Sequence, residues 1–292
     1  MPLVNMKPVL REAMEQGYAV AAFNLLDFST TKAMIKAAEE LSAPVIVQVS
    51  TKTIKYFSHK EVHSWVKVLA EDSPVPIVLH LDHCKDLEVI RKCAETGWTS
   101  VMIDASDQPF ETNLELSRQV AAIAKKHGIG MEAELGQILG VEDDMVVTED
   151  ESHLTDPADA ERFCKELDLS AFAAAIGSAH GYYKGEPKIA YDLIKEINSR
   201  THTPMALHGG TGLDEATIKR CIELGCAKIN ISTNLKHVFI ESFAQYHAEN
   251  PKDFEPLRLI DAQYKACKAL FKSKIEEFGG AGRAAELLAK AA

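Results

Sequence analysis

The chain has 292 residues, of which 46% are hydrophobic and 26% are charged, as expected for a globular protein with a large apolar core. Its formal net charge of −11 argues against nucleic acid or an anionic membrane as the main partner, because both bind basic surfaces. Local binding of a phosphate group remains compatible with this charge.

Cysteine usage and the apolar runs bear on the compartment. The six cysteines are far apart and form no C-x-x-C pair, which favours reduced thiols over a zinc ribbon or a disulfide scaffold. The first residues lack the pattern of a signal peptide, and no later apolar run is long enough to span a bilayer. We therefore expect a cytoplasmic protein with no membrane partner.

Apolar runs of strand length alternate with amphipathic segments of helix length along the whole chain. A short helix is predicted first, at residues 6–16. The eight predicted strands are residues 19–23, 44–49, 77–81, 100–103, 130–134, 171–176, 205–207 and 227–231. Helices predicted between or after them include residues 31–41, 87–96, 111–126, 156–167, 214–224 and 233–247.

This alternation predicts an α/β fold, specifically a (β/α)₈ TIM barrel with extra C-terminal helices. The strands are continuously apolar, as parallel strands covered on both faces are, and the loops that follow them would build the active site. A doubly wound sheet that binds a dinucleotide would need a glycine-rich turn after the first strand, where the chain reads Asn24-Leu25-Leu26-Asp27. No linker suggests a boundary, so we expect one domain over residues 1–292.

Two segments depart from the alternation. Residues 136–156 are rich in acids and long for a connection between strand and helix, which is typical of a mobile lid. Residues 256–292 add a helical extension, broken at Gly279-Gly280, that would cover the barrel or contact another subunit.

Three apolar runs are each followed by a histidine, namely His83, His180 and His208. In a barrel, the ends of the third, sixth and seventh strands face one mouth, so these imidazoles are expected to meet. Three imidazoles with an open fourth position are the ligand set of a catalytic zinc. A single histidine of this kind is more often an ordinary paired polar residue, but three in equivalent positions favour the metal site. His80 lies inside its strand, where core packing is the better interpretation.

Carboxylates are predicted at the same mouth: Asp82, Asp104 and Glu134. Each could orient a metal-bound histidine, move protons or hold a second, weaker divalent cation.

Phosphate-binding signals come from the last two strands. Gly209, Gly210 and Thr211 lie between a strand and a helix, where amides and a hydroxyl can surround an anion. The segment from Asn230 to Thr233 ends the eighth strand in the same way, at the usual phosphate site of such barrels. Further predicted substrate contacts are Asn24, Ser50, Gly181, Lys184, Ile231 and Ser232. Metal, phosphate and carboxylates together indicate enediolate chemistry beside the carbonyl of a phosphorylated sugar.

Five motifs carry a resemblance to a known family: HLDHC, EAELG, GSAHGYYKG, LHGGTG and KINIST. In this order, over essentially the whole chain, they resemble the zinc-dependent class II ketose-bisphosphate aldolases, which include the fructose- and tagatose-bisphosphate enzymes. The resemblance implies reversible cleavage of a ketose 1,6-bisphosphate, or a related ketose 1-phosphate, to dihydroxyacetone phosphate and an aldehyde.

The same resemblance implies roles for individual residues. Asp82 would protonate the aldehyde oxygen during cleavage, and Glu142, on the long acidic loop, would exchange the proton on the nucleophilic carbon. It also implies a homodimer or homotetramer, in which Arg258 could reach a neighbouring site, and a monovalent cation (Na⁺ or K⁺) near the phosphate. Zinc would be bound by His83, His180 and His208, a second cation by Asp104 and Glu134, and dihydroxyacetone phosphate by Gly181, Gly209, Gly210, Thr211 and residues 230–233.

One departure from the family pattern concerns substrate choice. Fructose-bisphosphate members usually carry Asp where this chain has Ser232, and Lys236 could replace a basic residue found slightly further on. A tagatose-type, sulfonated or deoxy ketose phosphate therefore remains open. Two different functions compete with the aldolase. One is a metal-dependent hydrolase, which would usually begin with H-x-H near Asn24, and the second is a non-catalytic barrel that binds zinc and sugar phosphate.

Overall fold

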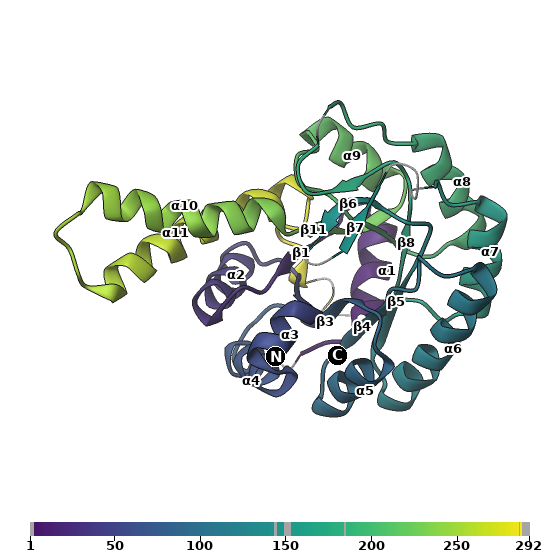
Figure 1. Ribbon diagram of the computed structural model, residues 1–292, viewed down its shortest axis with the longest axis horizontal. Helices are drawn as coiled ribbons and strands as arrows, with labels where there is room; N and C mark the ends of the chain where they lie inside the picture. Colours follow the sequence, from purple (N-terminus) through teal and green to yellow (C-terminus); the bar gives the residue numbers. More distant parts are fainter. Residues whose placement is uncertain (1–2, 143–144, 149–152, 184, 286, 288–292) are drawn as a thin grey trace.

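Eight parallel strands close into a barrel surrounded by helices in the computed structural model, which describes residues 3–142, 145–148, 153–183, 185–285 and 287 (Figure 1). The order around the barrel is β1-β11-β10-β8-β5-β4-β3-β2, and every neighbouring pair is parallel. The predicted TIM barrel is confirmed. The barrel strands are β1 (Val20–Asn24), β2 (Val45–Ser50), β3 (Ile77–Cys84), β4 (Ser100–Ile103), β5 (Gly130–Leu135), β8 (Ala171–Ala174), β10 (Met205–Leu207) and β11 (Cys226–Ile231).

Helices follow the strands, and several begin at capping residues that the sequence makes visible. Asp27, Asp156 and Asp214 each accept hydrogen bonds from backbone N–H groups in the first turn of α2, α7 and α9. The helices are α1 (Met6–Gln16), α2 (Phe28–Glu40), α3 (Thr51–Phe57), α4 (His59–Ala70), α5 (Leu87–Thr96), α6 (Phe110–His127), α7 (Pro157–Glu166), α8 (Tyr191–Thr201), α9 (Glu215–Glu223), α10 (Thr233–Glu249) and α11 (Pro256–Glu277).

The N-terminal helix α1 closes the end of the barrel where the strands begin. Its residues Met6 and Leu10 are fully buried and pack in one cluster with strand residues that point inward, such as Val78 and Ala206. A second, larger core fills the space between the barrel and the outer helices. Because α1 closes one end of the interior, a site open to substrate can form only at the other end, where the strands finish.

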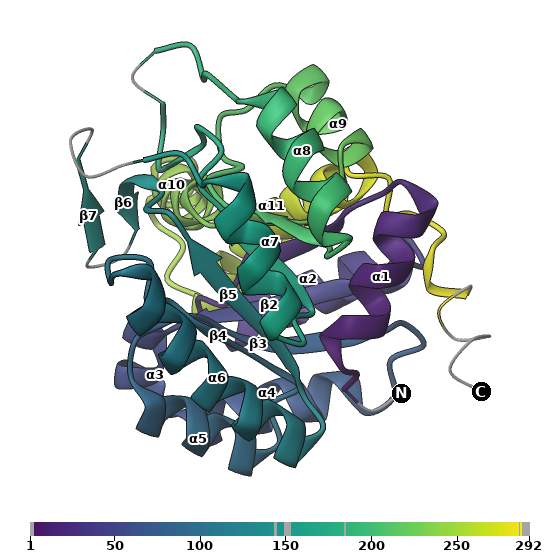
Figure 2. The same cartoon turned by 90° about the vertical axis from the view of Figure 1, so that its right-hand side faces the viewer.

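A small second sheet lies at that open end, and it corrects two predictions. Part of the predicted loop forms a hairpin, β6 (Leu139–Glu142) with β7 (Met145–Val147), and β6 also pairs with β9 (Ala179–His180). Figure 2 shows this hairpin beyond the tip of β5. The predicted strand 171–176 therefore ends early, at Ala174, because the chain leaves the barrel and then pairs with β6.

Helices α10 and α11 lie side by side and extend away from the barrel as an arm (Figure 1). The end of α11 nearest the barrel is anchored by Phe271, whose ring lies 4.7 Å from that of Phe23. Apolar side chains on the arm, Ile240, Phe254 and Leu257, are exposed. Within the described residues, no helix combines the length and apolar character that a membrane crossing requires.

Candidate active site

A bulge in β3 turns two consecutive side chains into the barrel. Leu81 pairs with Val101 and Cys84 with Ile103, so three steps along β3 match two along β4. In a regular strand, Asp82 and His83 would point to opposite faces. The extra residue, with His83 at a left-handed φ of 44°, lets both side chains reach the interior, where Asp82 is 1% and His83 7% exposed. Such backbone strain is concentrated at functional sites.

The three predicted histidines meet at the open end of the barrel. Nε2 of His83 lies 2.8 Å from Nδ1 of His208, which follows β10. The ring of His180, on β9, lies 5.2 Å from that of His83 and 5.8 Å from that of His208, centroid to centroid. One nitrogen from each ring falls within 4.8 Å of the others. His180 therefore joins the group from the second sheet and not from the end of a barrel strand.

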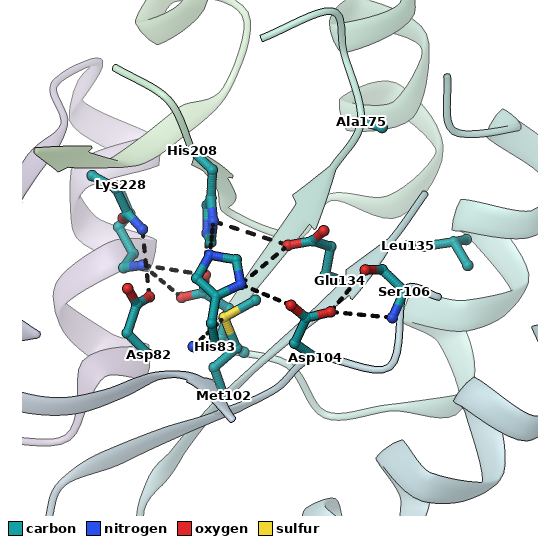
Figure 3. Close-up of polar contacts among 12 residues, drawn as sticks. Asp82, His83, Met102, Asp104, Ser106, Glu134, Leu135, Ala175, His208 and Lys228 are labelled. Carbon is teal, nitrogen blue, oxygen red and sulfur yellow. Dashed lines mark hydrogen bonds and ion pairs between the residues drawn. The ribbon is translucent and has the colours of Figure 1, made fainter. Parts of the chain in front are cut away.

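Carboxylates orient two of these rings, and Figure 3 shows one of these contacts, between His83 and Asp104. Nδ1 of His83 lies 2.9 Å from Asp104, and Nε2 of His208 lies 2.8 Å from Glu132. We infer that these outer nitrogens carry the hydrogens, which leaves the lone pairs of the two inner nitrogens facing each other. Burial also lowers the pKa of His208 to about 4, so its ring is neutral. Facing lone pairs are favourable only around a cation, and this donor set fits zinc.

Asp104 and Glu134 form a second possible cation site together with His83, with ligand atoms again within 4.8 Å. Burial would raise the pKa of Asp104, but hydrogen bonds from His83 and Ser106 hold it below its usual range. Burial and the nearby Asp104 raise the pKa of Glu134 well above its usual value. Oε2 of Glu134 is buried and has no hydrogen-bond partner among the described residues. A further cation is one way to satisfy this oxygen.

A buried polar layer lies beneath the histidines and was not predicted from the sequence. Nζ of Lys228, on β11, lies 3.0 Å from Glu132 on β5, and both side chains are fully buried. Nδ1 of His80 is 2.9 Å from Ser100, and its Nε2 is 3.4 Å from Glu132. His80 is fully buried inside its strand, as predicted, and packs there as part of this polar layer. The available signal was the E-x-E spacing, because Glu132 faces the same side of β5 as Glu134.

Asp82 is the carboxylate of the site nearest to the first and last strands. Its Oδ1 accepts a long hydrogen bond, 3.5 Å, from Nδ2 of Asn230. Ser50 lies beside it in the register of β2 and β3. Asn24, at the end of β1, accepts a hydrogen bond of 2.6 Å from Gln48. The predicted substrate contacts Asn24, Ser50 and Asn230 therefore lie around the same mouth as Asp82.

A pocket adjoins the histidines on the side of the last strands. The left-handed Gly209 (φ 71°) matters here, because a Cβ on it would lie 2.2 Å from the carbonyl oxygen of Ala179. Two predicted contacts, Gly210 and Ile231, do not line this pocket, and the side chain of Ile231 is buried in the outer core. Lys184 and the side chain of Glu142 lie outside the described residues. The lining residues are His180, Gly181, Gly209, Thr211, Asn230, Ser232, Thr233 and Lys236.

The fold and its mouth define a TIM-barrel protein whose three-histidine cluster has the donor set of a metal-dependent enzyme. Residues 4–283 match the family model described as fructose-bisphosphate aldolase class-II. The chain belongs to this family, and it is therefore a class II aldolase, a lyase that acts on a carbon–carbon bond. Family membership decides against a hydrolase and against a non-catalytic barrel.

Individual relatives agree along the whole chain. The chain is 40% identical to the fructose-bisphosphate aldolase of Geobacillus stearothermophilus, over 98% of its own length and 100% of that protein. It is 36% identical to the sulfofructosephosphate aldolase of Alkalicoccus urumqiensis, over 97% and 99% of the two lengths. The crystal structure of the YdjI aldolase from Escherichia coli K12 has a TM-score of 0.86 at 31% identity, covering 97% of this chain and 99% of that one.

Proposed function

We propose that this protein is a zinc-dependent aldolase that reversibly cleaves a phosphorylated ketose to dihydroxyacetone phosphate and an aldehyde. The observation that carries the proposal is the convergence of His83, His180 and His208, with ligand atoms within 4.8 Å, beside a pocket lined by glycines and hydroxyls. Such a site offers a metal and an anion-binding surface to neighbouring parts of one substrate.

Each carboxylate has a distinct proposed task. A bound zinc would supply Lewis-acid polarisation of the substrate carbonyl. Asp82, buried next to the histidines but not one of the converging ligands, would give a proton to the aldehyde oxygen during cleavage and remove it during condensation. Glu142 would exchange the proton on the carbon of the dihydroxyacetone phosphate half. Asp104 and Glu134 would hold a second divalent cation.

The phosphate half would be held by residues at the ends of β9, β10 and β11, with Lys184 and a monovalent cation, Na⁺ or K⁺, nearby. Support comes from the pocket that Gly181, Gly209, Thr211 and Ser232 line next to His180. Asn24, at the end of β1, and Ser50, at the end of β2, lie between β11 and the Asp82 strand β3 around the barrel, and both would contact the substrate there.

The aldehyde half of the substrate is the less determined part. A ketose 1,6-bisphosphate of the fructose or tagatose type is the main candidate, and relatives named for fructose bisphosphate and for sulfofructose phosphate match almost equally well. The Ser232 position, where fructose-type enzymes usually carry Asp, favours keeping a sulfonated or deoxy ketose phosphate as the alternative. A panel of fructose-type, tagatose-type, sulfonated and deoxy ketose phosphates, compared by kcat/KM, would identify the preferred substrate.

A metal-removal experiment tests the central proposal. Purified protein should contain zinc by elemental analysis, should lose aldol cleavage after exhaustive chelation, and should regain it with Zn²⁺ but not Mg²⁺. Cleavage that survives complete removal of metal would overturn the proposal. So would a metal-loaded protein that cleaves no ketose phosphate in the panel.

We also infer a homodimer or homotetramer in the cytoplasm. The exposed side chains of Ile240, Phe254 and Leu257 on the arm support a contact with a second copy, and Arg258, held by Asp253 at 2.7 Å, would lie at that contact. The six cysteines are buried and free, as in a reducing compartment. Light scattering should give a molecular mass that is a multiple of 32.1 kDa. Leu257→Glu should reduce this mass, whereas Val68→Glu, at an exposed position on α4 away from the arm, should not.

A further inference from the structure

His180 is the one histidine of the converging three that does not come from the barrel. It lies on β9, a strand of two residues at the edge of the second sheet, and among the described strands β9 pairs only with β6. This pairing sets Gly140 beside His180. His180 is also less buried than His83 and His208. Its position therefore depends on a strand from the long acidic loop, whereas the barrel fixes the other two.

Gly140 brings the backbones of β6 and β9 closer than any other residue could. A Cβ at this position would lie 2.3 Å from the carbonyl oxygen of His180 and 2.8 Å from its backbone nitrogen. An ordinary contact between non-bonded carbon atoms is roughly 3.5–4.0 Å, and no rotation of a side chain can move these main-chain atoms away. The φ of Gly140, 112°, also lies in the left-handed range that favours glycine. The pairing of β6 with β9 therefore requires glycine at residue 140.

A second glycine approaches the same short strand. A Cβ on Gly209 would lie 2.2 Å from the carbonyl oxygen of Ala179 and 3.1 Å from its backbone nitrogen. Gly209 directly follows His208, so this contact joins β9 to the segment that carries another of the converging histidines. The backbone of β9 is thus in close contact with glycines from two different segments, which leaves it little room to shift.

The geometry of a zinc site is sensitive to a displacement at this position. Zinc–nitrogen bonds are about 2.0–2.1 Å long, and distances in a well-formed site stay within about 0.2 Å of these values. Relief of a 2.3 Å contact to an ordinary distance would separate β6 and β9 by about 1 Å. A shift of this size would misplace the ring of His180 relative to those of His83 and His208.

We propose that Gly140 is a positioning residue for the zinc ligand His180, and that zinc binding and the pairing of β6 with β9 stabilise each other. The inference rests on the proposed function for the identity of the metal. The coupling is reciprocal, because a metal that binds only when His180 is in place also stabilises the strand pair that places it. Glu142 is the last residue of β6, two positions after Gly140, so its place in the chain would also depend on the bound metal.

The first test measures zinc affinity directly, by competition with a chelator, on the full-length protein. Gly140→Ala should bind zinc about 10- to 100-fold more weakly than the wild type, the usual effect of losing a group that orients a metal ligand. Gly282→Ala is the matched control and should bind zinc normally, because Gly282 also has a left-handed φ, 80°, but a Cβ there would meet nothing within 4 Å. Wild-type zinc affinity in a folded Gly140→Ala variant would overturn the inference.

Hydrogen-exchange mass spectrometry of the wild type tests the reverse direction and does not depend on the folding of any variant. Removal of zinc should speed exchange in peptides that cover residues 138–142 and 178–181, and much less in the peptide that covers α4, in the outer ring of helices. Equal exchange at residues 138–142 with and without zinc would also overturn the inference. If zinc affinity and exchange change as expected but no ketose phosphate is cleaved, the proposed function fails and the inference stands. A protein that binds no zinc would reject both.

Discussion

The mouth of the barrel has two sides that are built differently. On the side of β3, β4 and β5, three carboxylates, Asp82, Asp104 and Glu134, are almost completely buried, with exposures of 1 to 3%. On the side of β9, β10 and β11, the pocket wall next to His180 consists mainly of glycines and hydroxyls, together with Asn230 and Lys236. The first side offers titratable groups held in a fixed network, and the second offers mainly backbone and neutral donors.

This difference separates reaction from recognition. Buried carboxylates are costly unless they are paired, so their presence on one side indicates chemistry that needs acids and bases. Backbone N–H groups at glycines and a helix start do not titrate near neutral pH, but they bind an anion well. Substitutions of the carboxylates should therefore lower kcat. Substitutions on the glycine side, apart from the zinc ligands His180 and His208, should mainly raise KM.

Asp82→Ala should have the largest effect on turnover. We expect kcat to fall about 10²- to 10⁴-fold, because a positioned acid or base contributes that much. Zinc content and affinity for dihydroxyacetone phosphate should remain near wild type, since Asp82 is not one of the converging ligands. Steady-state kinetics with elemental analysis measures both. An unchanged kcat, or loss of zinc in parallel with activity, would remove Asp82 from this role.

Glu132→Gln should have the next largest effect, through the metal. Glu132 orients His208 at 2.8 Å, and loss of such a partner typically lowers metal affinity about 10- to 100-fold. It would also leave Lys228 buried without its carboxylate, at a cost of about 3–5 kcal/mol. Competition with a chelator and thermal unfolding measure the two effects.

The pair itself provides the control for this prediction. The double variant Glu132→Gln/Lys228→Met should regain much of the stability that Glu132→Gln loses, because no unpaired charge remains. Its metal affinity should stay as low as that of Glu132→Gln. Glu95→Gln, at an exposed position of α5, should change neither. If zinc affinity rises and falls with stability in all three variants, then Glu132 affects zinc binding through overall stability and not by orienting His208.

The fold was predictable because its signals are local. The side chains of each barrel strand that face the outer helices are apolar, and those that face inward near α1 are mostly small or apolar. The alternation of such apolar runs with amphipathic helices was therefore enough to predict eight β/α units. The boundaries agree closely where a capping residue is present, as at Asp156 and Asp214. The end of β8 was predicted two residues too late, since the apolar run continues through Ala175 and Ile176, which are buried beyond the strand.

The site was predictable only in part, because much of it depends on register between distant strands. The barrel predicted that His83, His180 and His208 would meet, although His180 reaches the group from β9, outside the barrel. The bulge that turns both Asp82 and His83 inward is a property of the β3–β4 pairing. The pairing of Glu132 with Lys228 likewise joins residues 96 positions apart. Nothing in the local sequence around either residue indicates its partner.

The smallest predicted effect concerns Tyr183, which links the two loops of the glycine side. Its hydroxyl accepts a hydrogen bond from the N–H of Ala179 at 3.1 Å and donates one to the carbonyl of Gly209 at 2.9 Å. Tyr183→Phe removes this link at a cost of about 1 kcal/mol, which corresponds to a roughly five-fold rise in KM for the ketose phosphate. Because no acid or base is lost, kcat should stay within about two-fold of wild type. Tyr182→Phe, at the neighbouring position where the ring is 52% exposed, should leave both constants unchanged. A fall in kcat with KM unchanged in Tyr183→Phe would mean that the glycine side also takes part in the reaction, which would end the proposed separation of the two sides.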